Sequence, residues 1–297
     1  MGLHLNKCTQ RCKMNIEKLA IPKKGRVYEQ VLKLMVDAGL VLKREPRLDF
    51  CICKALGIGV YFLPAKDIPN AVASGAIHYG VTGLDLIEDS GADVDIHLPL
   101  GIGKARMVLA SPEDNPYDSL QSLNDKRIGS SYIKLADNFL KKNGVKGYSL
   151  IHFSGSVEIQ VAMGVVDAIV DITETGSSLH ANRLVVREEI LKSEMVLMGT
   201  KGYKSNSLDL LIKRIQRVNR GRSHVLLKFN IHKDLVKNAC SLSQGMSSST
   251  INNLAESNQV AMEVAIAKKE LHELMDKLIG LGATGILSHE LSLCAPD

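Results

Sequence analysis

The chain has 297 residues, of which 45% are hydrophobic and 23% charged, a composition typical of a globular protein with two or three domains. No apolar run reaches the ~18 residues of a membrane span, and the start lacks the apolar core of a signal peptide, so we expect a cytoplasmic protein without a membrane partner. The net charge of +5 is concentrated in residues 1–26, and with no Trp and 4% aromatic residues the chain lacks the footprint of a nucleic-acid binder.

Periodic sequence begins at Met14, and we interpret residues 1–13 as a disordered extension. After it, short apolar strands alternate with helical patterns. Strands are predicted over Lys18–Pro22, Leu48–Cys53, Gly59–Leu63 and Tyr79–Thr82, and helices from Val27 to Gly39 and over Ile68–Ser74. This alternation predicts a parallel α/β sheet whose two faces are covered.

The next block repeats the alternation. It predicts strands over Arg106–Ala110, Arg127–Ser130, Tyr148–His152, Ala168–Ile172 and Met195–Gly199, with helices near Leu135–Leu140, after Ser154-Gly155-Ser156, and over Leu208–Val218. The serine hydroxyls of that Ser-Gly-Ser run are expected to cap the helix that follows. Arg220-Gly221-Arg222 is interpreted as a domain boundary.

Beyond the boundary the order of elements changes. A strand, a helix, two strands, a helix and a strand are predicted between His224 and His289. This β-α-β-β-α-β order is the ferredoxin-like plan. Appended domains of this kind bind effectors or build oligomers, and the plan alone does not decide between the two.

The richest cluster of polar residues follows the buried strand at Ala168–Ile172. The hydroxyl and glycine residues Thr173, Thr175, Gly176, Ser177 and Ser178 form a turn, with Glu174 among them. Such turns present backbone N–H groups and hydroxyls to a phosphate. Asp167 and Asp171 lie four residues apart and are expected on one face at the carboxyl end of the strand, where ribose hydroxyls and Mg²⁺-bound pyrophosphate need carboxylates. An ordinary turn between a strand and a helix remains the alternative.

Two other loops follow strands of the first block. Lys23-Lys24-Gly25-Arg26 could direct cations at pyrophosphate, or could be a solvated charge run at the start of a helix. Thr82-Gly83-Leu84-Asp85 could supply a carboxylate to the site, or Asp85 could cap the next helix. Loops at strand ends are what an open α/β binding site requires.

These stretches together resemble the ATP phosphoribosyltransferase family in its long form, and fungal members most. The resemblance runs in order from about residue 18 to about residue 200 and extends weakly to the end through Leu281-Gly282-Ala283-Thr284. It implies a bilobed catalytic unit like the periplasmic binding proteins. Lobe I would comprise residues 14–105 with 194–220, lobe II residues 106–193, and a histidine-binding regulatory domain residues 221–297. It also implies a homohexamer, with dimers.

The implied reaction is attack by N1 of ATP on the anomeric carbon of phosphoribosyl pyrophosphate (PRPP), which releases pyrophosphate and uses Mg²⁺ bound mainly through the substrate. Position by position, the resemblance assigns PRPP to Asp167, Asp171, Thr173, Glu174, Thr175, Gly176, Ser177 and Ser178. It assigns the phosphates and the nucleotide to Lys24, Gly25, Arg26, Arg47 and Asp85. Fixed charges and orientation suffice for this chemistry, so no protein nucleophile is expected.

Three positions depart mildly from the family pattern: Val166 replaces a small residue, Ser178 a threonine and Ala105 a cysteine. A larger departure is Gly245–Ile251, which replaces a basic, proline-containing stretch of the regulatory domain and puts histidine feedback in question. The rival hypothesis is a non-catalytic small-molecule-binding protein of the same bilobed fold.

Overall fold

The computed structural model describes residues 16–45, 48–115, 117–243, 245, 249–255 and 258–295. The chain forms two compact units that divide between Leu210 and Leu211, and Asp37–Gly39 belongs to the second. Within the described ranges, no helix is long and apolar enough to cross a membrane.

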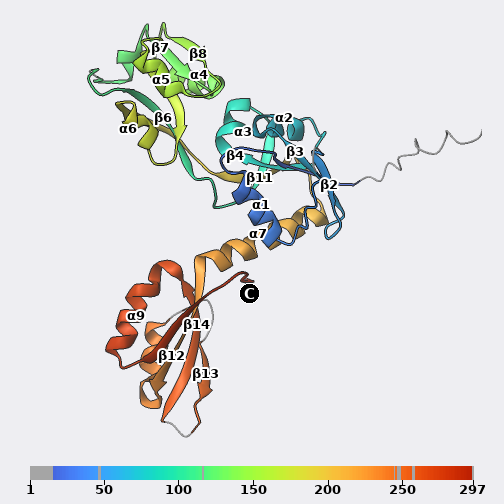
Figure 1. The fold of residues 1–297 in the computed structure, drawn as a ribbon, viewed down its shortest axis with the longest axis vertical. Helices are drawn as coiled ribbons and strands as arrows, with labels where there is room; N and C mark the ends of the chain where they lie inside the picture. The colour runs from blue at the N-terminus through green and yellow to red at the C-terminus, as the bar shows by residue number, and fades with distance from the viewer. Residues whose placement is uncertain are drawn as a thin grey trace, which may run out of the picture. The chain divides into compact units, whose positions relative to one another are not determined.

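The first unit contains two sheets, each with its own layer of helices (Figure 1). The first sheet has six strands in the order β2-β3-β1-β4-β11-β5. Its strands are β1 (Lys18–Pro22), β2 (Phe50–Cys53), β3 (Ile58–Leu63), β4 (Tyr79–Gly83), β5 (Val94–Pro99) and β11 (Met195–Thr200), and its helices are α1 (Tyr28–Asp37), α2 (Ile68–Ala73) and α3 (Leu84–Ser90). β1 is parallel to both β3 and β4, whereas β2, β5 and β11 are antiparallel to their neighbours.

The second sheet has five strands in the order β10-β6-β9-β7-β8. Its strands are β6 (Ala105–Pro112), β7 (Arg127–Ser130), β8 (Ser149–His152), β9 (Ala168–Thr173) and β10 (Leu184–Ser193), and its helices are α4 (Ile133–Lys142), α5 (Val157–Ala162) and α6 (Ser177–Ala181). β7 is parallel to β8 and β9, so their carboxyl ends share one edge of the sheet.

Burial explains why β1 and β9 lie inside their sheets. Four of the five β1 residues are buried, and Ala168, Ile169 and Val170 of β9 are fully buried. Strands covered on both faces are continuously apolar, as these two are. Polar residues begin where each strand reaches its carboxyl end.

Two peptide segments join the sheets, and they are hydrogen-bonded to each other. One connects β5 to β6, and the other is the β10–β11 junction at Glu194. The backbone N–H of Leu100 donates to the carbonyl of Met195 at 2.9 Å, and the N–H of Met195 donates to Ile102 at 3.0 Å. The chain therefore crosses twice between the two parts of the bilobed fold that the family resemblance implies.

One local expectation, the serine cap before α5, is wrong, and two strands are missed. Ser156 precedes α5 but makes no capping hydrogen bond through its side chain, and its φ of +50° is left-handed. β5 and β10 are strands that the apolar patterning does not reveal. The helix α7 (Asn206–Ser223) runs through Arg220-Gly221-Arg222, where the sequence predicts a domain boundary. A Cβ atom at Gly221 would lie 2.8 Å from the backbone of Ser292, so close approach requires this glycine.

The second unit carries the predicted ferredoxin-like plan. Its elements are β12 (His224–His232), α8 (Val236–Leu242), β13 (Thr250–Asn253), β14 (Gln259–Ala267), α9 (Leu271–Gly280) and β15 (Thr284–Glu290). The strand order is β13-β14-β12-β15, all antiparallel. Figure 1 shows α9 packed along this sheet. Alternate residues of β12 and β14 are buried, and the core includes Phe229, Met262 and Leu278.

Candidate active site

The carboxyl ends of the two parallel strand sets face each other across the first unit. Arg26, which follows β1, forms an ion pair with Glu174, which follows β9. The Lys66 ammonium donates to the carbonyl of Ser131 at 3.3 Å and lies 5.6 Å from the centre of the Tyr132 ring. Lys66 follows β3, and Ser131 and Tyr132 follow β7. The predicted loops of both lobes therefore border one cleft.

The Thr173–Ser178 loop, which we call the phosphate loop, is held by its own hydroxyls. Thr173 Oγ1 accepts from the N–H of Gly176 at 2.9 Å, and the hydroxyls of Thr175 and Ser177 lie 2.9 Å apart. Gly176 has a φ of +82°, and no protein atom lies within 4 Å of where its Cβ would be. The glycine thus gives the loop a left-handed turn and leaves its outer side open to a ligand.

Asp171 lies at the carboxyl end of β9 beside this loop. Its Oδ1 accepts from the N–H of Ile172 at 2.8 Å. Burial and the neighbouring charge of Glu158 raise the pKa of Asp171 to about 6, although the Ile172 hydrogen bond and Lys66 act in the opposite direction. α6 begins only at Ser177, after Gly176, so Asp171 does not cap that helix. A carboxyl group in a cleft with a pKa near neutrality is a candidate ligand-binding group.

Asp167 does not lie where the spacing predicts. It precedes β9, at the amino end, so the whole strand separates it from the phosphate loop. Its carboxylate pairs with Arg127 at 2.9 Å, which lowers the pKa of Asp167. Residues four apart do share a face of a strand, but about 13 Å of strand separates them. Asp167 therefore serves the pairing of β7 with β9.

We expect Asp167→Asn to leave PRPP affinity within about twofold and to lower the free energy of unfolding by at most about 1 kcal/mol, because the Arg127 pair is partly exposed. Calorimetric titration and a denaturant melt of the variant check both values. A large loss of PRPP affinity at unchanged stability would show that Asp167 takes part in PRPP binding.

Asp85 is buried at the start of α3, with 5% of its surface exposed. Its Oδ1 accepts from the Ser193 hydroxyl at 2.6 Å, and the backbone N–H of Asp85 donates to the same serine oxygen at 3.1 Å. Burial and a hydrogen bond to Asp85 raise the pKa of Tyr132. The alternative interpretation of Asp85 as a helix cap is wrong, because Gly83 precedes the helix and no side-chain cap bond forms.

The remaining predicted site residues follow β1. Lys24, Gly25 and Arg26 are exposed at its carboxyl end, and Gly25 has a φ of +111°. Arg26 reaches the phosphate loop through Glu174. Arg47 lies outside the described residues.

Three residues that line this cleft are missed by the sequence analysis: Lys66, Tyr132 and Ser193. Lys66 and Tyr132 follow the parallel strands β3 and β7, and Ser193 ends β10; each contacts residues distant in sequence. A polar residue shortly after a predicted strand is a signal for Lys66 and Tyr132. No local pattern marks Ser193, because β10 itself is unpredicted.

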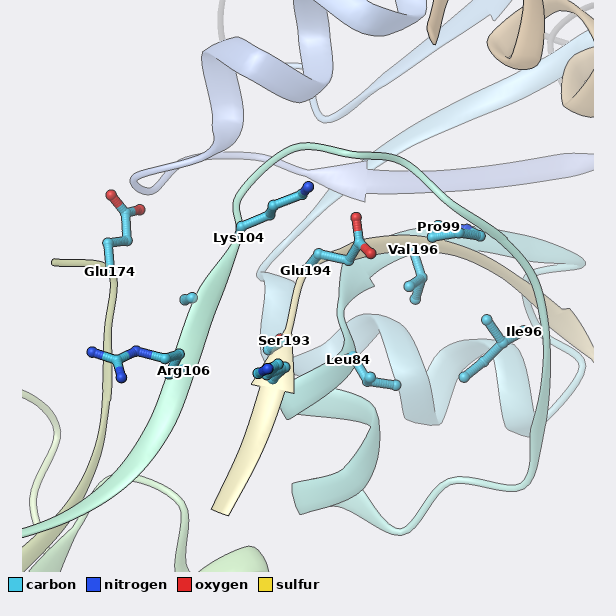
Figure 2. A pocket seen from close by; sticks show the side chains of 11 residues that line it. Leu84, Ile96, Pro99, Lys104, Arg106, Glu174, Ser193, Glu194 and Val196 are labelled. Atoms are coloured by element: carbon cyan, nitrogen blue, oxygen red, sulfur yellow. The ribbon is translucent and has the colours of Figure 1, made fainter. Parts of the chain in front are cut away.

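A cavity of about 600 Å³ adjoins the cleft at the lobe junction. Figure 2 shows its apolar end at Ile96, Pro99 and Val196, and its charged end at Lys104, Arg106 and Glu174. Ser193 also lines it and connects it to Asp85. An apolar surface beside cations can accept an aromatic base that carries phosphates.

The described residues contain no group of three or more His, Cys, Asp or Glu side chains placed to hold a metal ion. Mg²⁺ commonly takes only one or two carboxylates when phosphates supply its other ligands. Asp171, with its second oxygen free of the Ile172 bond, fits that donor set.

Comparison with known proteins identifies the chain. A family model described as ATP phosphoribosyltransferase matches residues 64–217, and one described as the HisG C-terminal domain matches residues 221–292. An ATP phosphoribosyltransferase of Rhodopirellula baltica is 37% identical over 93% of this chain and 93% of its own length. A fungal one, from Candida albicans, is 33% identical over 93% of this chain and 95% of its own length.

A solved structure agrees with these relatives. The ATP phosphoribosyl transferase (HisG:HisZ) complex from Thermotoga maritima contains a chain that is 26% identical, with a TM-score of 0.59, and the match covers 68% of this chain and 99% of that one. Fold and relatives together define a pentosyltransferase. The chain belongs to the ATP phosphoribosyltransferase family, whose members act in histidine biosynthesis. The match to the C-terminal domain makes it a long-form member.

Proposed function

We propose that the cleft transfers the phosphoribosyl group of PRPP to N1 of ATP, with the phosphate loop on the 5-phosphate and Asp171 on the ribose hydroxyls. Lys24 and Arg26 face the departing pyrophosphate from the other lobe. The observation that carries this assignment is that Asp171 and the hydroxyl loop lie together at the carboxyl end of β9, where Glu174 of the loop pairs with Arg26 at the end of β1.

Charge and orientation account for the chemistry. The anomeric carbon becomes cationic as pyrophosphate leaves, and an ionised Asp171 beside the ribose stabilises that charge. Arg26 supplies a bidentate donor to the leaving group. Closure of the lobes through Lys66 and Tyr132 holds the two substrates in line and excludes water, which lowers the entropic part of the barrier.

The nucleotide is assigned to the lobe-junction cavity. Its apolar end accepts the adenine, and the cations Lys104 and Arg106 lie within reach of the triphosphate. Asp85 borders the cavity through Ser193 and orients the base. Asp171 would share Mg²⁺ with the substrate phosphates, and the ion would neutralise charge on the departing pyrophosphate.

Turnover tests the proposal against a non-catalytic binding protein of the same fold. Purified full-length protein, given ATP, PRPP and Mg²⁺, should release pyrophosphate and form a phosphoribosyl-ATP product. Binding of both substrates without pyrophosphate release would favour the binding protein.

The second unit is proposed to bind histidine and to build a cytoplasmic homohexamer from dimers. The ferredoxin-like plan and the C-terminal family match support this role. Of the unusual Gly245–Ile251 stretch, residues 246–248 lie outside the described residues, as do residues 1–13.

Histidine titration of the full-length enzyme tests this regulatory role. We expect millimolar histidine to lower turnover and light scattering to report a hexamer. Full activity at that concentration would mean that the altered stretch has removed feedback, whereas a hexamer that ignores histidine would leave only the assembly role.

A further inference from the structure

Two glutamates hold two hydrogen-bond donors that substrate phosphates need. Glu174 forms an ion pair with Arg26 across the cleft. Glu158, on α5, accepts the hydroxyl proton of Ser178 in the phosphate loop. Both contacts involve the enzyme's own carboxylates, and both lie at proposed phosphate positions.

A carboxylate and a phosphate compete for such donors because each offers anionic oxygens. A serine hydroxyl has one proton, so Ser178 cannot donate to a phosphate while it donates to Glu158. The planar fork of an arginine fits a carboxylate and a phosphate in the same way. A bound phosphate must therefore displace Glu158 from Ser178, and at Arg26 it competes with Glu174 for part of the guanidinium.

The ion pair between Arg26 and Glu174 is weak enough for a phosphate to displace Glu174. The Arg26 and Glu174 side chains are 49% and 42% exposed, and an ion pair this exposed is worth about 1 kcal/mol or less. Pyrophosphate carries more charge than a carboxylate and takes Arg26 readily. When pyrophosphate leaves, Glu174 is at hand to pair with Arg26 again.

We propose that Glu174 is a positioning residue that competes with pyrophosphate for Arg26 and thereby promotes release of this product, while Glu158 exerts the same competition on the 5-phosphate at Ser178. The inference rests on the proposed function, since it takes the pyrophosphate at Arg26 and the 5-phosphate at Ser178. The family resemblance assigns Glu174 to PRPP binding. In the role proposed here, Glu174 instead weakens the binding of a ligand phosphate at Arg26.

Glu174 contacts Arg26 and Glu158 contacts Ser178, and the proposed function gives these two groups to different phosphates, so the effects of the two glutamates separate by ligand. Glu174→Gln should bind pyrophosphate up to about fivefold more tightly, with ribose 5-phosphate unchanged. Glu158→Gln should bind ribose 5-phosphate more tightly by a similar factor, with pyrophosphate alone unchanged. Calorimetry on the full-length protein gives both dissociation constants, and product inhibition by pyrophosphate gives an independent value for Glu174→Gln.

Glu113→Gln is the matched control, because Glu113 is an exposed residue of the same lobe and its replacement removes the same charge. It should change neither constant. Weaker pyrophosphate binding by Glu174→Gln, or equal shifts for both ligands in both variants, overturns the inference. Failure of the proposed function appears separately, as wild-type protein that does not turn over ATP and PRPP, and overturns both.

Discussion

Asp171→Asn is expected to lower PRPP affinity or kcat/KM by about ten- to a hundredfold, because a charge-assisted hydrogen bond to the ribose is worth ~1.5–3 kcal/mol. Asn keeps the size of the side chain but removes its charge and one acceptor oxygen. Steady-state kinetics measure the loss. Asp167→Asn, at the other end of β9, is the matched control and should retain activity.

The pH dependence of Asp171 gives a second readout. Its pKa is raised to about 6 in the folded protein, so the carboxylate forms as pH rises through that value, and PRPP affinity should rise with it. The effect of Asp171 on stability has the opposite pH dependence. The protonated, buried acid stabilises the fold fully below the unfolded pKa of about 4, and this stabilisation is lost as pH rises through about 6. At pH 8 the Asn variant should therefore be at least as stable as wild type.

The Asp171→Asn variant distinguishes the titration of Asp171 from the titration of the PRPP phosphate. The second ionisation of a phosphate monoester also lies near 6, so the wild-type rise contains both groups. Asp171→Asn should keep only the part that belongs to PRPP. Equal pH profiles in the two proteins, or full activity of the variant at unchanged stability, would remove Asp171 from the sugar site.

Gly176→Val is expected to cost on the order of tenfold or more in PRPP affinity, since the new side chain fills the open side of the phosphate loop. The φ of +82° also disfavours a β-branched residue by about 1–2 kcal/mol. Titration calorimetry measures the affinity, and a thermal melt measures the strain.

A second glycine distinguishes these two effects. Gly164 has a φ of +70° and open space around its Cβ position, but it lies in the turn before β9, away from the phosphate loop. Gly164→Val should show the strain without the loss of affinity. If both variants bind PRPP as wild type does, the 5-phosphate lies elsewhere.

The sequence predicts the parts of this fold whose determinants are local. Continuous apolar runs identify β1, β4 and β9, and the strand-helix order identifies the ferredoxin-like plan of the second unit. β10 is missed because it carries charges at Arg187, Glu188 and Glu189 and has two register shifts against β6. β5 is missed because its residues are at best half-buried at the edge of the sheet.

The candidate site also contains residues that local sequence predicts and residues that only long-range contacts bring together. The phosphate loop follows directly from a buried strand and a run of small hydroxyl residues, so its position could be predicted. Asp167 was misplaced because periodicity gives the face of a strand and not its end. Asp85 needed Ser193, which lies 108 residues later, and this pairing arises only when β10 crosses back between the lobes.

The paired crossings between the lobes have a mechanical consequence. Because the two peptide segments are hydrogen-bonded to each other through Leu100, Met195 and Ile102, we expect them to hinge together and not separately. Hinge bending at this point should then dominate the relative motion of the lobes. One pair of fluorescent labels, one on each lobe, would report that motion.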